Sequence, residues 1–154
     1  MELIELIDSD SVVANLRVTS KKQALQDLAR RAGEITSIDE RKIFDVLMER
    51  ERLGTTGVGS GIAIPHGKLS ELEKIRGIFA RLEKPVDFQA IDDHPVDLIF
   101  VLLAPEGAGA GHLKALARVS RLLRDDDICK KLRATAESDA LFGILSEPQE
   151  SRAA

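Results

Sequence analysis

Residues 96–104, which read Val-Asp-Leu-Ile-Phe-Val-Leu-Leu-Ala, constrain the fold more than any other segment. This run is almost continuously apolar, and only Asp97 interrupts it. A strand with one solvated face alternates apolar and polar residues, whereas a strand covered on both faces is apolar throughout. The run is also far shorter than the ~20 residues that a membrane-spanning helix needs. We therefore predict that residues 96–103 form a central strand with other layers on both of its faces.

Helical and extended patterns alternate along the rest of the chain. Ser20 suits a helix N-cap, and Ser37-Ile-Asp-Glu40 has the capping-box pattern that opens a second helix, which Gly54 ends. Residues 62–67 should form a short extended stretch that ends at Pro65. Strands interspersed with helices predict a layered α/β fold. Further strands are expected at residues 12–18 and 75–82, and further helices at residues 111–123, 126–134 and 138–145.

The chain has 154 residues, which suits one ordinary domain and is too short for two. No linker or internal repeat interrupts it before the polar end, which reads Glu-Pro-Gln-Glu-Ser-Arg-Ala-Ala. We expect a single domain over residues 1–146 and a frayed tail over residues 147–154.

Composition excludes several classes of function. Lys and Arg total 22 against 26 Asp and Glu, and the aromatic residues are five Phe. This composition argues against a general nucleic-acid binder, which needs a basic face and stacking platforms, and leaves a local basic patch open. Cys129 is the single cysteine, which suits a reducing compartment. The N-terminal residues lack a signal-peptide pattern. We expect a cytoplasmic protein that binds no nucleic acid and does not insert into a membrane.

The glycine-rich segment at residues 57–61 matches no nucleotide-binding motif. Ile62 stands where the third glycine of the dinucleotide fingerprint would be, and the spacing from Gly61 to Lys68 does not fit a P-loop. The segment is either a flexible connection or a nest of backbone N–H groups that binds an anion.

Two histidines and one arginine are candidate functional residues. His66 lies between Pro65 and Gly67, so it is either a rigidly held ring at a sheet edge or a turn histidine without a role. His112 begins a helix on its apolar face, which indicates a half-buried core residue or a group at an anion-binding helix N-terminus. Arg50, in the last turn of the second helix, offsets the helix dipole or binds phosphate.

The remaining reactive side chains are interpreted as structural. Cys129 should be a buried, inert thiol, and His94 a solvated turn residue. Asp92 and Asp93 should form an exposed acidic turn, and residues 125–127 a helix start. Neither acidic group has the spacing of a divalent metal site.

Several motifs in order carry a resemblance to a known family. Arg50 stands sixteen residues before the histidine of Gly61-Ile-Ala-Ile-Pro-His-Gly67, and His112 follows. The chain resembles the enzyme IIA proteins of the mannitol/fructose class in the bacterial phosphoenolpyruvate-dependent phosphotransferase system. Within that class it is most similar to the nitrogen-regulatory branch, enzyme IIA-Ntr. Further similarity lies at residues 20–25, 49–52, 95–105 and 112–117.

The resemblance implies a mixed β-sheet of about five strands flanked by helices on both faces. It also implies that His66 carries a phosphoryl group on Nε2, received from an HPr-like phosphocarrier protein. Arg50, His112 and amides of the glycine-rich loop would stabilise the phosphoryl charge, so no metal or cofactor is expected. We expect a hydrogen bond to fix the other ring nitrogen, and we expect Ile62 and Ile64 to form an apolar rim around the acceptor.

By the same resemblance, we expect a phosphohistidine carrier whose phosphorylation state regulates partner proteins. In relatives of this kind, such partners include potassium transport systems and sensor kinases. Two alternatives stay open. One is a sugar-specific IIA component that passes phosphate to a IIB domain for fructose or mannitol uptake, and the other is a binding module that is not phosphorylated.

Overall fold

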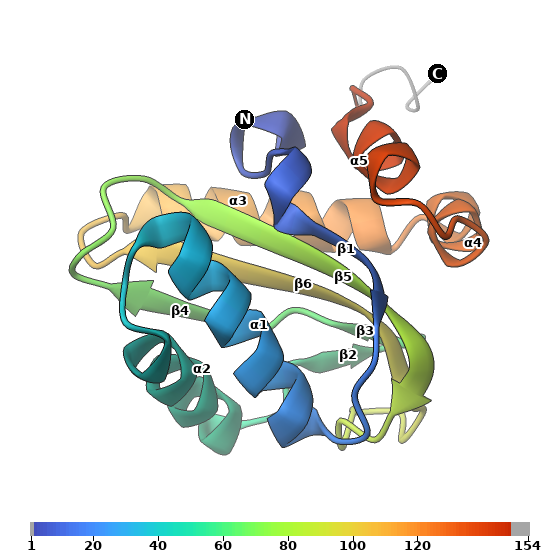
Figure 1. Cartoon of the computed structure of the whole chain (residues 1–154), viewed down its shortest axis with the longest axis horizontal. Coiled ribbons are helices and arrows are strands. Elements are labelled where there is room, and N and C mark those ends of the chain that lie inside the picture. Colours follow the sequence, from blue (N-terminus) through green and yellow to red (C-terminus); the bar gives the residue numbers. More distant parts are fainter. Residues whose placement is uncertain (1, 149–154) are drawn as a thin grey trace.

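The computed structural model describes residues 2–148, and a mixed sheet forms its centre (Figure 1). The strands are β1 (Val12–Leu16), β2 (Gly57–Gly59), β3 (Ile62–Ala63), β4 (His66–Leu69), β5 (Arg76–Val86) and β6 (Val96–Pro105). They lie in the order β1-β5-β6-β3-β2, and β4 also pairs with β6. β6 is antiparallel to β5 and parallel to β3 and β4. The predicted mixed sheet is confirmed, with six strands among the described residues in place of about five.

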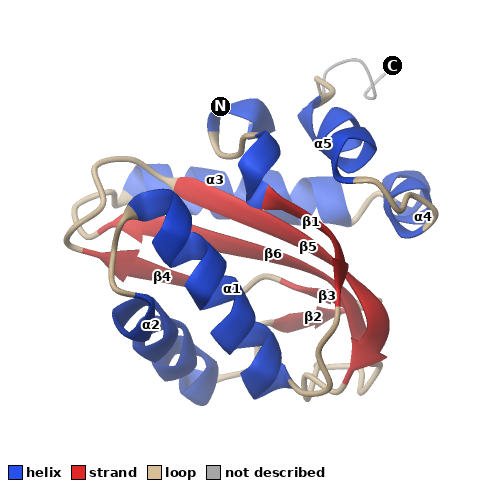
Figure 2. Cartoon of the chain, in the orientation of Figure 1, coloured by secondary structure: helices blue, strands red, loops and turns tan. Residues whose placement is uncertain are grey.

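Helices cover both faces of this sheet. Figure 2 shows the strands as one layer, with helices in front of it and behind it. The helices are α1 (Lys21–Thr36), α2 (Glu40–Leu53), α3 (Ala110–Leu123), α4 (Asp126–Arg133) and α5 (Ser138–Ser146), with short 3-10 helices at Leu3–Glu5 and Ser9–Ser11. α1 and α2 lie on one face, and α3 to α5 lie on the other (Figure 1).

β6 is the central strand that the apolar run predicts. Ile99, Val101 and Leu103 pack into the apolar cluster under α1 and α2. The alternate residues Leu98, Phe100 and Leu102 pack into the cluster under α3 to α5. Successive side chains of a strand point to opposite faces, so both faces of β6 are buried. This strand therefore fixes the place of every element that pairs with it, β4 included.

The start of α2 differs from the prediction. Ser37 ends α1 in the left-handed conformation, with φ of 62°, and its N–H donates to the Gly33 carbonyl. An N-cap residue needs an extended backbone, which Ser37 does not have. Asp39 caps α2 instead, and its side chain accepts from the Arg41 N–H at 3.0 Å. The N-cap at Ser20 is confirmed, because its hydroxyl accepts from the Gln23 N–H.

The extended stretch does not end at Pro65, as the sequence indicated, but resumes as β4. Ile62 pairs with Leu98 of β6, and His66 pairs with Leu102 of the same strand. Proline has no N–H to donate to a ladder, so the pairing is interrupted between β3 and β4. His66 therefore begins a strand and does not terminate one.

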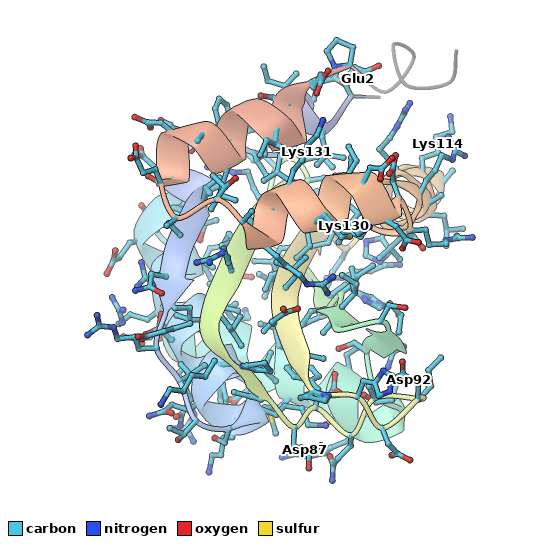
Figure 3. All side chains as sticks on the ribbon, turned by 90° about the vertical axis from the view of Figure 1, so that its right-hand side faces the viewer. Glu2, Asp87, Asp92, Lys114, Lys130 and Lys131 are labelled. Carbon is cyan, nitrogen blue, oxygen red and sulfur yellow. The ribbon has the colours of Figure 1, made fainter. Side chains whose placement is uncertain are left out.

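Figure 3 shows Asp87 and Asp92 on the loop at one end of the sheet, and Lys130 and Lys131 on α4 toward the other end. No helix among residues 2–148 is both long enough and apolar enough to span a membrane. α5 ends at Ser146, and residues 149–154 of the predicted tail lie outside the described residues.

Candidate functional site

The three candidate residues come together at one edge of the sheet. His66 begins β4, Arg50 lies in the last turn of α2, and His112 lies in the first turn of α3. Arg50 Nε is 3.2 Å from His66 Nε2, and the two imidazole centroids are 5.7 Å apart with their planes tilted by 50°. Elements from both faces of the sheet thus contribute to one site.

The tautomer of His66 follows from its two hydrogen bonds. Nδ1 lies 2.8 Å from the Ile64 carbonyl oxygen, which can only accept, so Nδ1 carries the hydrogen. Nε2 then has a free lone pair, which accepts the N–H of Arg50 Nε. The half-buried ring is therefore held in the form in which Nε2 is the nucleophilic nitrogen. Ile64 supplies the partner that the sequence did not identify.

Arg50 is held by the chain segment that follows its own helix. Its Nη1 donates to the Gly54 carbonyl at 2.9 Å, while Nε donates to His66. Gly54 caps α2, as predicted, so the guanidinium satisfies a carbonyl near the negative end of the helix dipole. The structural interpretation of Arg50 is therefore confirmed, and its binding of phosphate stays a prediction.

Gly67 allows α2 to approach β4 closely. A Cβ atom on Gly67 would overlap Val46 Cγ1, far inside van der Waals contact. Val46 stands one helical turn before Arg50, and Gly67 follows His66. The absent side chain thus lets Arg50 reach the imidazole.

His112 has a different environment. The residue is only 6% exposed, and its Nδ1 has no hydrogen-bond partner among the described residues. A buried polar atom of this kind calls for an explanation, because nearly all such atoms in folded proteins are paired. The ring is a close neighbour of His66, because the two centroids lie 5.7 Å apart.

Both rings are poised to be neutral. Burial lowers the pKa of His66 below its ordinary 6.5, and Arg50 lowers it further, although the Ile64 carbonyl and Glu51 act in the opposite direction. Burial also lowers the pKa of His112, as do the charge that His66 carries when it is protonated and the positive charge of Lys68. A neutral imidazole with a free lone pair is what nucleophilic attack on phosphorus requires.

The glycine-rich segment has two amides with partners outside the site, and the expectation that its amides line the site stays a prediction. It forms β2 and the turn into β3, four residues along β6 from the His66 pairing. The Ser60 N–H donates to Asp92 Oδ2 at 2.9 Å, and the Gly57 N–H donates to Thr55 Oγ1 at 3.1 Å. These amides are used to hold the hairpin in place.

The structure also shows the environments of Ile62, Ile64, Cys129 and His94. Ile62 and Ile64 are buried in the cluster under α3 to α5, so they form no apolar rim around His66. Cys129 is buried, its thiol donates to the Leu123 carbonyl at 3.2 Å, and burial raises its pKa, all of which fit an inert thiol. His94 is exposed, as expected. No cluster of three His, Cys, Asp or Glu residues within residues 2–148 could hold a metal ion.

One residue beside the site escaped the sequence analysis. Glu51 is buried, and it binds Lys21 and Thr56. Glu51 lies between two arginines in a charged helix turn, a pattern that is typical of a solvent-exposed residue. No local pattern therefore indicated that it is buried.

The chain is similar to several known proteins along most of its length. The family model described as "Phosphoenolpyruvate-dependent sugar phosphotransferase system, EIIA 2" matches residues 5–147. A nitrogen regulatory protein of Bradyrhizobium diazoefficiens is 58% identical over 148 residues, which cover 96% of this chain and 97% of that protein. A fructose-specific EIIA component of Haloferax volcanii is 40% identical over 123 residues, covering 80% of this chain and 79% of that protein. The crystal structure of the nitrogen regulatory protein IIA-Ntr from Neisseria meningitidis superposes with a TM-score of 0.88 at 33% identity, over 93% of this chain and 98% of that one.

Proposed function

The chain belongs to the EIIA 2 family of the phosphoenolpyruvate-dependent sugar phosphotransferase system, and from this premise we propose that His66 is its phosphoryl acceptor. The family supports a phosphocarrier role and phosphotransfer through a phosphohistidine. We assign Arg50 and His112 as the groups that stabilise the phosphoryl charge. The donor is an HPr-like phosphocarrier protein, and the reaction takes place in the cytoplasm. One domain over residues 1–146 carries the whole function.

The observation that carries the proposal is the pair of hydrogen bonds on His66. Because the Ile64 carbonyl holds the hydrogen on Nδ1, the Nε2 lone pair attacks phosphorus while the P–N bond to the donor imidazole breaks. The bonding pair leaves with the donor nitrogen, so the donor ring becomes neutral. The His66 ring becomes a cation, and the Ile64 carbonyl continues to accept its Nδ1 hydrogen.

Arg50 and His112 act on the transferring phosphoryl group. The Arg50 guanidinium lies against the attacked nitrogen, so a small rotation brings its N–H groups to the phosphoryl oxygens. His112 has an unused ring nitrogen in a buried position, where a hydrogen bond to an anion is strong. Such preorganised donors replace the metal that kinases use for the same charge.

The carrier regulates other proteins through the charge that it gains. The phosphoryl group carries about −1.5 to −2 charges at pH 7 if phosphohistidine resembles other phosphorylated side chains, and the cationic ring offsets about one of them. A protein surface that accepts neutral His66 against its own carboxylates then loses affinity, and one that offers arginines gains it. The relatives named as nitrogen regulatory proteins support a regulatory role. By the family resemblance, we propose potassium transport systems and sensor kinases as the kinds of target.

Transfer from a phosphorylated HPr-like protein tests the acceptor assignment. We expect the intact mass to rise by one phosphoryl group, and we expect peptide mapping to place an acid-labile, alkali-stable modification on His66. Loss of the modification in His66→Ala supports the proposal. An undiminished modification in that variant refutes it.

A second candidate function is that of a sugar-specific IIA component. The 40% identical fructose-specific EIIA component of Haloferax volcanii favours it. The phosphorylated chain is therefore mixed with a fructose-type IIB domain, and with cell extract in which His66→Ala and the phosphomimetic His66→Asp serve as separate baits. Rapid transfer to IIB favours sugar uptake, whereas a partner that distinguishes the two baits favours regulation.

A further inference from the structure

Glu51 is a buried carboxylate that the transfer step does not itself use. Its side chain is 3% exposed, and Oε1 lies 3.1 Å from Lys21 Nζ. The Thr56 N–H is 3.1 and 3.2 Å from the two carboxylate oxygens, and the Thr56 hydroxyl donates to Oε2 at 2.6 Å. A buried charge persists only where partners satisfy it in this way. The network therefore holds Thr56 firmly against the end of α2.

Thr56 is connected to His66 through Ile64. The Thr56 carbonyl accepts the Ile64 N–H at 3.0 Å, and the Ile64 carbonyl accepts the His66 Nδ1 hydrogen at 2.8 Å. On the other side, the Pro65 carbonyl accepts the Leu102 N–H of β6 at 2.9 Å. The Ile64–Pro65 peptide group, whose carbonyl fixes the His66 tautomer, thus lies between two peptide groups that are held, one by Thr56 and the other by the central strand.

Glu51 also affects the contact to Nε2, the second ring nitrogen of His66, because Glu51 follows Arg50 in the chain. Anchoring Glu51 at the end of α2 fixes the direction in which the Arg50 side chain leaves the helix. Arg50 then donates a hydrogen bond to Nε2, while Glu51 is connected to Nδ1 by a chain of hydrogen bonds through Thr56 and Ile64. Two successive residues therefore control the two nitrogens of one imidazole.

We propose that Glu51 and Thr56 are positioning residues for phosphoryl acceptance, because they hold the Ile64 carbonyl where it keeps the hydrogen on Nδ1 and leaves Nε2 free. This inference rests on the proposed role of His66 as acceptor. Neither residue has a hydrogen bond to the imidazole, so both act through Ile64 and Arg50. A ring that is oriented in advance does not need to reorganise in the transition state.

The test compares two adjacent threonines. Thr56→Val removes the hydroxyl that binds Glu51. Thr55→Val is the matched control, because the Thr55 hydroxyl donates to the Phe88 carbonyl at 2.9 Å and accepts the Gly57 N–H, neither of which leads to His66. The tautomer is read from imidazole nitrogen NMR at about pH 8, where histidine is neutral.

We expect wild-type His66 to hold its hydrogen on Nδ1. Thr56→Val should give a second population with the hydrogen on Nε2 and should slow phosphate acceptance about tenfold, the effect of one hydrogen bond to a charged group. Thr55→Val should change neither measurement, and Thr56→Ser should restore both. A Thr56→Val protein with the wild-type tautomer and transfer rate overturns the proposal.

Glu51→Gln provides a second, independent variant. It preserves the shape of the side chain and removes its charge, so we expect a mixture of His66 tautomers and slower acceptance. An unchanged tautomer in folded Glu51→Gln also overturns the proposal. The NMR measurement needs no phosphoryl donor. A wild-type protein that holds the hydrogen on Nδ1 and accepts no phosphate would therefore refute the proposed function, while the variants still decide the positioning role.

Discussion

His66 and His112 lie side by side, yet the fold gives them opposite environments. His66 is half-buried, and both of its ring nitrogens have partners, one on Ile64 and one on Arg50. His112 is almost fully buried, and its Nδ1 has no hydrogen-bond partner among the described residues. The His66 ring is fixed in the tautomer that leaves a lone pair on Nε2. The His112 ring has a buried Nδ1 that no group among the described residues binds.

This difference separates the two tasks of a phosphoryl acceptor site. A nucleophile must present a lone pair in a constant direction, which requires hydrogen bonds in the resting state. A group that stabilises developing charge is useful only when that charge arrives, so an unpaired resting state is compatible with its task. We therefore assign the chemistry to His66 and the charge stabilisation to His112 together with Arg50.

The largest expected effect is that of His66→Ala. Removing the ring removes the only nitrogen that we assign as acceptor, so phosphate acceptance should fall to background in a transfer assay with a phosphorylated HPr-like protein. His112→Ala should still acquire the modification, at a lower rate. If the label moved to His112 in the His66→Ala protein, the division of tasks between the two rings would be wrong.

Arg50→Ala and His112→Ala should each slow acceptance by about 100-fold or more, since one preorganised donor at such a site is worth roughly 2.7–4 kcal/mol. Both variants should fold, as thermal melts will check. Arg52→Ala is the matched control, because Arg52 lies in the same helix turn and its guanidinium pairs with Glu49 at the surface. A rate equal to wild type in both site variants would show that neither residue touches the transferring group.

Gly67→Ala tests whether close packing brings the two sides of the site together. The added Cβ atom would overlap Val46, so we expect a loss of about 1–3 kcal/mol in the free energy of unfolding and slower acceptance as Arg50 moves away. Urea unfolding measures the first effect. Gly107→Ala is the control, since nothing lies within 4 Å of its added Cβ atom.

The double variant Val46→Ala, Gly67→Ala makes room for the new methyl group. It should recover part of the transfer rate that Gly67→Ala loses. A Gly67→Ala protein as stable and as active as wild type would mean that α2 does not need this approach to β4.

The sequence predicted those parts of the fold that depend on local patterns. The apolar run of β6 identified a strand buried on both faces, and Ser20 and Gly54 marked helix ends, because each signal lies within a few residues. The prediction for Ser37 was wrong. Its capping-box pattern indicates the start of a helix, but the residue takes the left-handed conformation that ends α1. Conformation at such junctions depends on tertiary contacts.

The site could be predicted only in part for the same reason. The resemblance identified His66, Arg50 and His112, and the structure brings them together. The conspicuous glycines at residues 57–61 proved to be part of a hairpin, whereas the single Gly67 allows the decisive helix contact. No sequence pattern reveals that Glu51, Thr56 and Ile64 are connected, because backbone groups and a buried carboxylate form those links.

The smallest expected effect is the dependence of stability on pH that comes from the two rings. Burial holds the pKa of His66 and of His112 below 6.5, so the unfolded chain takes up protons first as the pH falls. The stability from keeping each ring neutral is present above about pH 6.5 and is lost as the pH falls through the folded-state pKa.

Urea unfolding at about pH 7.5 and about pH 5.5 should therefore show a smaller loss of stability for His112→Gln than for wild type. His66→Gln should also reduce the loss, although the Ile64 carbonyl and Glu51 partly oppose the effect of burial at that ring. If neither variant changed the pH dependence, both rings would titrate alike in the folded and unfolded chains, and burial could not be what keeps His66 neutral for attack.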